Sequence, residues 1–383
     1  MSIENSNNGN KKPLFYLLVI TIPLVIFLLS GEVIARFLIS PQNIPNPPLP
    51  SIVDPYQPNL YMVQIRPYLY FHIPTTVYTQ ARADYQVAYE INTRGFRGPE
   101  IMVPKPSGLK RLLIIGDSIV EGHGSHFTKT FAYRLDENIR SAGWEVVNVG
   151  VQGASPIYYA ANTDRYLSLQ PDAVLIMTYE NDIWEDRIRE VSYFDLPYID
   201  DVDRILTQSP TSNIMFASYF YLALNRLRQD FTSPPLEQII ARNREIIAMN
   251  QAHQTASLDP FLIEPSLIDQ QWRMSQEYLD YAVASFQQNN VQVLVTNLSI
   301  KSIRPDVDSA YHDYAFNVDE RVSTWAEEKQ IPSFSLLPVI IQIFKEKEIS
   351  EVIIEGDGHP TSNTHAIMET ALRPWLLQKL NHQ

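Results

Sequence analysis

Residues 110–122 read KRLLIIGDSIVEG and combine a buried strand with a tight turn. The run up to Ile115 is continuously apolar after its first two residues, as a strand of a parallel sheet requires when helices cover both of its faces. A Gly-Asp-Ser turn follows at once and places Ser118 where the strand ends. Gly-Asp-Ser alone is a weak signal, because the same residues make ordinary turns and helix caps. Its position after a buried strand makes Ser118 a candidate nucleophile.

Extended and helical patterns alternate along the rest of the chain. Further strands are expected at residues 146–149, 173–178, 291–297 and 333–337, and helices at 131–142, 156–169, 272–288, 317–329 and 361–380. Five strands alternating with helices predict an α/β three-layer sandwich with a five-stranded parallel sheet. In such folds the functional site lies at the carboxyl ends of the strands.

The N-terminal segment predicts a membrane anchor. Residues 13–31 contain no charged side chain, and their length is about that needed to cross a hydrocarbon core. We therefore expect a transmembrane helix over residues 13–38. Lys11 and Lys12 precede it, so the positive-inside rule places residues 1–12 in the cytoplasm and the bulk of the chain in the periplasm or outside the cell. A cleavable signal peptide is the competing interpretation, although no clean small-x-small cleavage site follows the apolar run.

The remaining chain divides into a linker, a small β-rich extension and one large domain. Residues 41–58 are rich in proline and predict a semi-rigid spacer. Residues 59–109 form the β-rich extension, with a strand expected at 85–92. The large domain spans residues 110–383 and carries an aromatic-rich insertion at about 186–265. Such an insertion serves either as a lid or only as its own packing layer.

Composition excludes several classes of protein. The chain has 43 acidic and 30 basic side chains, a formal net charge of −13, which argues against nucleic acid as a partner. It has no cysteine, so disulfides and thiolate metal sites are excluded. We expect no cofactor and no metal ion. His123 and His126, with Glu121, have a spacing that also fits a metal site, and this stays a minor alternative.

Two other strand ends carry groups that suit an oxyanion hole. Residues 148–153 read NVGVQG after the second strand, and the backbone N–H of a glycine there can approach a developing negative charge without obstruction. Residues 179–182 read YEND after the third strand and bring the amide of Asn181 to the same edge. An ordinary strand-to-helix loop explains the first of these blocks equally well.

His359 is the strongest candidate for a general base among the eight histidines. It lies in the run EGDGHP at residues 355–360, directly before the last helix, which places it at the active edge of the sheet. Asp357 stands two residues earlier and is suited to hold the imidazole in the tautomer that accepts the serine proton.

Together these blocks resemble the SGNH, or GDSL-type, hydrolase superfamily over roughly residues 110–380. The resemblance implies a flavodoxin-like SGNH fold without a cofactor. It also implies the site residues: Ser118 is the nucleophile and His359 the base. Gly153 and Asn181 are the two oxyanion groups. Two features depart from the family pattern: Tyr179 replaces the usual glycine, and the spacing from Asp357 to His359 is one residue short. The acidic partner is therefore open between Asp357 and Glu355.

The resemblance extends to a bacterial, single-pass membrane-anchored subgroup and implies a serine esterase. Its substrate would be an acyl ester, with a carbohydrate or lipid of the cell envelope as the group that is deacylated. Two alternatives stay open. One is an O-acyltransferase that uses the same residues on an envelope polysaccharide, and the other is a non-catalytic envelope scaffold.

Overall fold

The computed structural model describes residues 52–53, 62–66, 69–82, 85–189 and 265–381, together with Pro23 and Ser30. The expected cytoplasmic tail at 1–12 lies outside these residues, and so does nearly all of the expected anchor at 13–38 and of the linker at 41–58. Most of the insertion at 186–265 lies outside them too. Among the described residues, no helix is both long enough and apolar enough to cross a membrane.

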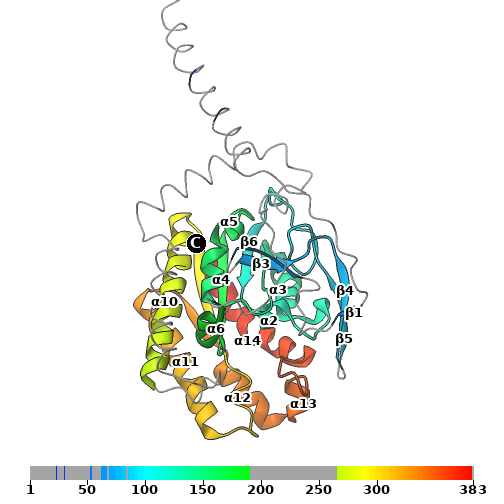
Figure 1. Ribbon diagram of the computed structural model, residues 1–383. Coiled ribbons are helices and arrows are strands. Elements are labelled where there is room, and N and C mark those ends of the chain that lie inside the picture. The colour runs from blue at the N-terminus through cyan, green and yellow to red at the C-terminus, as the bar shows by residue number, and fades with distance from the viewer. Residues whose placement is uncertain are drawn as a thin grey trace, which may run out of the picture.

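A five-stranded parallel sheet forms the centre of the large domain (Figure 1). Its strands are β6 (Lys110–Ile115), β7 (Trp144–Asn148), β8 (Ala173–Tyr179), β9 (Gln292–Leu298) and β10 (Ser333–Ser335). They lie in the order β7-β6-β8-β9-β10, and every neighbouring pair is parallel. The five predicted strands and their parallel arrangement are confirmed. Because the chain runs outward in opposite directions from β6, the crevice for a ligand is expected between the ends of β6 and β8.

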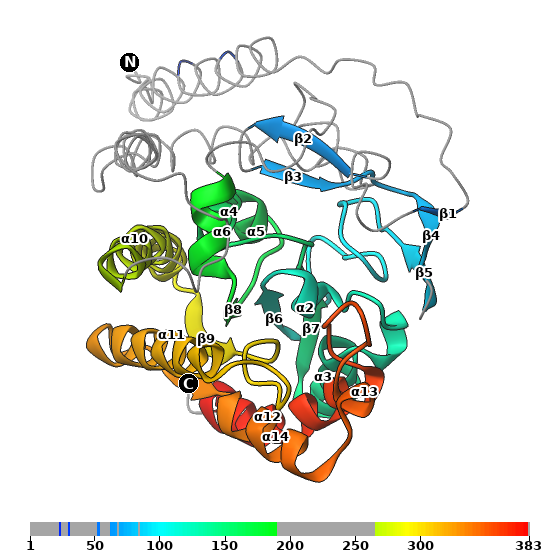
Figure 2. The ribbon, with the colours of Figure 1, turned by 60° about the horizontal axis from the view of Figure 1, so that its bottom comes forward.

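Helices cover both faces of the sheet, as Figure 2 shows. One face carries α4 (Pro156–Ala161), α5 (Thr163–Leu167), α6 (Asp182–Arg189) and α10 (Pro265–Gln288), and the other carries α3 (Phe131–Ile139), α12 (Leu337–Glu346) and α14 (Ser362–Asn381). Alternate strand residues serve the two faces: Leu113 belongs to the core cluster under α10, whereas Leu112 belongs to the cluster under α3 and α14. Each fully buried side chain of this size contributes about 1.5–3 kcal/mol. The predicted three-layer sandwich is confirmed.

The helices differ from the predicted ones in several places. The single helix expected at 156–169 is broken at Asn162, whose side-chain N–H₂ donates to the backbone oxygen of Tyr158 at 2.9 Å. Such a side-chain bond competes with the helical hydrogen-bond ladder. Helix α11 (Ser309–Glu328) begins well before the expected start at 317, because Asp308 caps it by accepting from a backbone N–H at 2.9 Å. Helices α12 and α13 (Ile349–Val352) were not predicted.

The chain before the large domain contains several short strands and is tied firmly to that domain. It contains the hairpins β2–β3 (Met62–Arg66 and Leu69–His72) and β4–β5 (Val77–Ala81 and Gln86–Glu90), with β1 (Ile52–Val53) paired to β4. Arg97, just after this layer, stacks on the ring of Tyr89 at 3.7 Å. Its guanidinium also donates to three backbone oxygens of the serine turn, those of Glu121 (3.3 Å), Gly122 (2.7 Å) and Ser125 (2.7 Å). The extension and the serine turn therefore form one packed unit.

Candidate active site

The Gly-Asp-Ser turn has a structural reason for each of its residues. Ser118 is the first residue of the short helix α2 (Ser118–Glu121), directly after β6, and is only 7% exposed. Asp117 caps this helix by accepting from a backbone N–H of the first turn at 2.9 Å. At Gly116 a Cβ would lie 2.3 Å from a methyl group of Val120 and 3.0 Å from the backbone oxygen of Met177, so any larger residue would force these neighbours to move. The turn therefore holds Ser118 at the carboxyl edge of the sheet, beside the switch point.

Ser118, His359 and Asp357 form one hydrogen-bonded chain. The Nε2 atom of His359 lies 2.8 Å from Oγ of Ser118. Its Nδ1 atom is bonded to a carboxylate oxygen of Asp357. An ionised carboxylate can only accept, so Nδ1 carries the proton and Nε2 is left to accept from the serine. Glu355, the other candidate for the acid, is exposed.

The short spacing between Asp357 and His359 works because the loop folds back on itself. Gly356 and Gly358 flank the aspartate with φ angles of +74° and +82°, a left-handed conformation that favours glycine. The backbone N–H groups of Asp357 and Gly358 both donate to the oxygen of Ile354, at 3.1 and 2.8 Å. Ile354 in turn donates to the oxygen of His359 at 2.8 Å. These turns bring the carboxylate beside the imidazole although only one residue separates them.

The electrostatics of the chain favour a neutral histidine beside a charged carboxylate. Burial opposes ionisation of Asp357, but hydrogen bonds from His123 and His359, together with their charges, hold its pKa well below its usual range. Burial, followed by the charges of His123 and Lys301, lowers the pKa of His359 to about 3, although Asp357 acts in the opposite direction. The imidazole is therefore unprotonated over the ordinary pH range, which is the state that can take a proton from Ser118.

The two predicted oxyanion groups lie at the strand ends on either side of Ser118. Gly153 follows β7, is buried and has a φ of +69°. Asn181 follows β8, and its side-chain N–H₂ donates to Glu185 at 2.9 Å rather than to Ser118. Tyr179, which replaces the family's glycine, is 1% exposed and packs in the core cluster with α12 and α14.

Sequence reasoning missed a group of buried carboxyls behind the serine. Asp182, Glu185 and Asp186 occupy one face of α6, and all three are buried; the first two lie near Asp117. Burial, and then the neighbouring charge of Glu185, raises the pKa of Asp117 to about 7. Burial likewise raises the pKa of Asp186 to about 7, although Asp186 accepts from Ser275 at 2.5 Å. The helical spacing of the three α6 carboxyls was visible in the sequence, but their burial was not.

His123 lies against the triad, although the sequence indicated it only as a ligand of the alternative metal site. Its ring lies against that of His359, with 4.3 Å between centroids and a tilt of 30° between the ring planes. Its Nε2 atom lies 2.9 Å from the hydroxyl of Tyr85 and 3.6 Å from a carboxylate oxygen of Asp357. The ligand atoms of the two histidines and Asp357 lie within 4.8 Å of one another, close enough to hold one metal ion. Arg82 already donates to Asp357 at 2.8 Å, and its positive charge opposes a cation at that oxygen.

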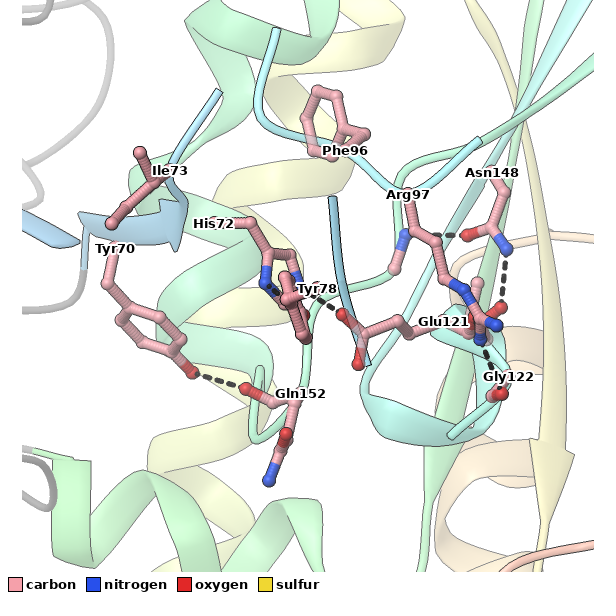
Figure 3. Close-up of polar contacts among 12 residues, drawn as sticks. Tyr70, His72, Ile73, Tyr78, Phe96, Arg97, Glu121, Gly122, Asn148 and Gln152 are labelled. Atoms are coloured by element: carbon pink, nitrogen blue, oxygen red, sulfur yellow. Dashed lines mark hydrogen bonds and ion pairs between the residues drawn. The ribbon is translucent and has the colours of Figure 1, made fainter. Parts of the chain in front are cut away.

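The alternative metal site of the sequence analysis is not formed, because Glu121, His123 and His126 do not lie together. Glu121 is buried and bonded to His72 of β3, as Figure 3 shows. The other ring nitrogen of His72 lies 3.0 Å from the hydroxyl of Tyr78. His126 is exposed, whereas His123 is buried. Glu121 thus joins the extension to the serine turn and leaves His123 free to contact the triad.

Comparisons with known proteins find solved structures with low similarity to this chain. No family model matches the chain, and no curated protein matches it. A GDSL-like lipase from Bacteroides thetaiotaomicron is 13% identical with a TM-score of 0.38, over 71% of this chain and 89% of that chain. A lipolytic protein of the G-D-S-L family from Veillonella parvula is 12% identical with a TM-score of 0.38, over 70% of this chain and 98% of that chain. An acetylxylan esterase from Geobacillus stearothermophilus, a catalytic mutant, is 13% identical with a TM-score of 0.41, over 72% and 95%.

Two of these names belong to the superfamily that the sequence motifs resemble. At such low identities and TM-scores, the roles of residues in this chain cannot be inferred from these structures. The hydrogen-bonded Ser118, His359 and Asp357, at the switch point of a parallel sheet, identify a candidate serine-hydrolase centre on the chain's own geometry.

Proposed function

We propose that this chain is a serine esterase in which Ser118 is the nucleophile and His359 its general base. The observation that carries the proposal is the 2.8 Å contact between Nε2 of His359 and Oγ of Ser118, with Asp357 bonded to the other ring nitrogen. A serine, an imidazole and a carboxylate in this order make an activated nucleophile. The lowered pKa of His359 supports the same roles, because a base must be unprotonated to act.

The reaction proceeds in two steps. Ser118 attacks the acyl carbonyl while His359 takes its proton, and the backbone N–H groups of Ser118 and Gly153 with the amide of Asn181 hold the oxyanion. An amide has two N–H donors, so Asn181 can keep its bond to Glu185 and use the other. His359 then gives its proton to the departing alcohol. A water, activated by the same imidazole, releases the acyl group and restores the serine.

We place this activity on the outer side of the cell membrane, on a single-pass anchor at residues 13–38. The uncharged run at 13–31 and the lysines before it support this location. The substrate that suits such a location is an acyl ester of a cell-envelope carbohydrate or lipid.

Labelling with a serine-directed fluorophosphonate tests the proposal on the full chain in detergent. The wild type should be labelled, and Ser118→Ala and His359→Ala should both abolish labelling. Circular dichroism verifies that each variant is folded. A folded wild type that is not labelled, or labelling that survives Ser118→Ala, would reject the assignment.

A further inference from the structure

The β4–β5 hairpin of the extension reaches the carboxylate of the triad. Arg82 follows β4 and Tyr85 precedes β5, and the backbone N–H of Arg82 donates to the oxygen of Tyr85 at 2.8 Å. Nη1 of Arg82 donates to Oδ2 of Asp357 at 2.8 Å, and Nη2 donates to the backbone oxygen of Gly356 at 3.4 Å. The side chain of Asp357 is 2% exposed and that of Arg82 is 22% exposed. The arginine therefore closes one side of the acid's site.

Tyr85 reaches the triad through His123. Its hydroxyl lies 2.9 Å from Nε2 of His123, whose ring lies against that of His359. His123 is 3% exposed and follows the end of α2, where its backbone N–H donates to the oxygen of Ser118 at 2.9 Å. The position of the His123 ring is thus set by the serine turn on one side and by the hairpin on the other.

These contacts supply what the acid's own loop lacks. Asp357 stands between two glycines, which restrict the backbone least of all residues. One carboxylate oxygen serves His359, and the other accepts from Arg82 at 2.8 Å and lies 3.6 Å from Nε2 of His123. A displacement of about 1 Å in such a group costs roughly 100-fold in rate. The loop therefore needs a restraint from outside, and the hairpin provides one.

We propose that the β4–β5 hairpin is a positioning element of the triad: Arg82 fixes the carboxylate of Asp357, and Tyr85, acting through His123, fixes the ring of His359. The inference rests on the proposed function. None of the three residues touches the reacting atoms, so they are positioning residues and not catalytic ones. The charged and titratable groups around His359 are Asp357 on its own loop, His123 after α2, Lys301 after β9 and, beyond Asp357, Arg82 and Tyr85.

The charge of Arg82 gives a readout that a merely structural role would not move. The guanidinium partly neutralises Asp357, so its removal strengthens the attraction of Asp357 for an imidazolium. The pKa of His359 then rises. Arg82→Gln should therefore shift the acid limb of the kcat/KM profile to higher pH and lower kcat by about 10- to 100-fold with little change in KM. Arg82→Lys keeps the charge and should restore the position of the limb.

Arg140→Gln is the matched control, because Arg140 is exposed and pairs with Asp136. It should leave both the rate and the limb unchanged. An Arg82→Gln enzyme that behaves like Arg140→Gln would overturn the inference. The inference would also be overturned if the acid limb of Arg82→Lys lay at the same pH as that of Arg82→Gln.

Tyr85 and His123 are tested as a pair. Tyr85→Phe removes only the hydroxyl and should lower kcat by about 10-fold, whereas Tyr133→Phe, the matched control, should not. If Tyr85 acts through His123, the double variant Tyr85→Phe with His123→Gln should be no slower than His123→Gln alone, because residues in one network are not additive. If the loss of kcat in the double variant equals the product of the two single losses, Tyr85 does not act through His123.

Fluorophosphonate labelling separates the two possible failures. A folded wild type without Ser118-dependent labelling rejects the esterase itself. Normal wild-type labelling, together with an equal labelling rate in Arg82→Gln, rejects only the positioning role. If Arg82→Gln does not fold, the isosteric Tyr85→Phe and the Arg82→Lys profile still decide the question.

Discussion

The carboxylate of Asp357 orients His359 through a single hydrogen bond, and that bond can be tested by a near-isosteric change. Asp357→Asn keeps the size of the side chain, but its amide no longer selects the tautomer with Nδ1 protonated. We expect kcat for ester hydrolysis to fall by about 10⁴-fold, the loss typical of this change in serine triads. Steady-state turnover of a chromogenic ester measures it.

The control for this variant is Glu355→Gln, at the exposed acid that competed with Asp357 in the sequence. It should retain the activity of the wild type. If Glu355→Gln were inactive and Asp357→Asn active, Glu355 would be the acid that orients His359.

The pH dependence of the rate follows from the buried imidazole of His359. Burial, with the charges of His123 and Lys301, lowers its pKa to about 3. The base is neutral above this value and protonated below it, so kcat/KM should stay level from about pH 5 to pH 7 instead of falling near the usual histidine pKa of about 6.5. A pH profile of kcat/KM, with circular dichroism at each pH, checks this.

Lys301→Gln sharpens the test. It removes a positive charge that disfavours the imidazolium, so the acid limb should move to higher pH. A wild-type kcat/KM profile that falls near pH 6.5, and that Lys301→Gln does not shift, would contradict the lowered pKa of His359.

At the residue scale the sequence allowed part of the site to be predicted. Ser118 and His359 could be placed because each stands at the end of a recognisable strand or before the last helix. Asp357 stayed open against Glu355, because only the folded loop shows which carboxylate turns inward. Arg82 lies 275 positions away from Asp357 along the chain, so no local pattern points to their contact.

The elements of the fold differed in how far they could be predicted. Strand β8 is buried at every residue, and its continuous apolar run was clear in the sequence. The break at Asn162 between α4 and α5 was not, because it depends on a side-chain to backbone bond that leaves the apolar spacing unchanged. Helix α12 was missed for the opposite reason: it directly follows the three-residue strand β10, and their apolar residues merge into one run.

Helix α6 presents buried carboxyls to the core, and these make stability depend on pH. Burial raises the pKa of Asp186 to about 7, whereas an unfolded aspartate titrates near 3.9. The protonated group thus stabilises the fold fully below about pH 4, and this contribution is lost as the pH rises through about 7. Asp186→Asn carries no such proton, so it should be more stable than the wild type at pH 8 by about 1–3 kcal/mol, with little difference at pH 4.

Urea unfolding of both proteins at the two pH values measures this difference. Asp313→Asn, at an exposed position of α11, is the matched control and should give the same difference from wild type at pH 4 and pH 8. A stability gain that is larger at pH 4 than at pH 8 would mean that Asp186 is ionised in the folded protein.

At the scale of the whole molecule, the described part of the extension packs with the large domain as one unit. His72 of β3 bonds to Glu121 beside the serine turn, and Arg82 after β4 bonds to the acid of the triad. A truncation that removes the proposed anchor should therefore end before β1, which begins at Ile52. We predict that the full chain stays with the membrane fraction after an alkaline carbonate wash, and that residues 39–383 appear in the supernatant with their esterase activity intact.

A second truncation shows which boundary matters for activity. Residues 91–383 keep the whole parallel sheet but lose the hairpin and β3, so Glu121 loses its buried partner His72 and Asp357 loses Arg82. Leaving a buried polar group without its hydrogen-bond partner costs about 1–3 kcal/mol, and more for a charged group. This form should therefore be inactive or fail to fold, unlike residues 39–383. If residues 39–383 still sediment with washed membranes, the anchor is not what holds the chain there, and a membrane-binding surface must be sought after residue 38.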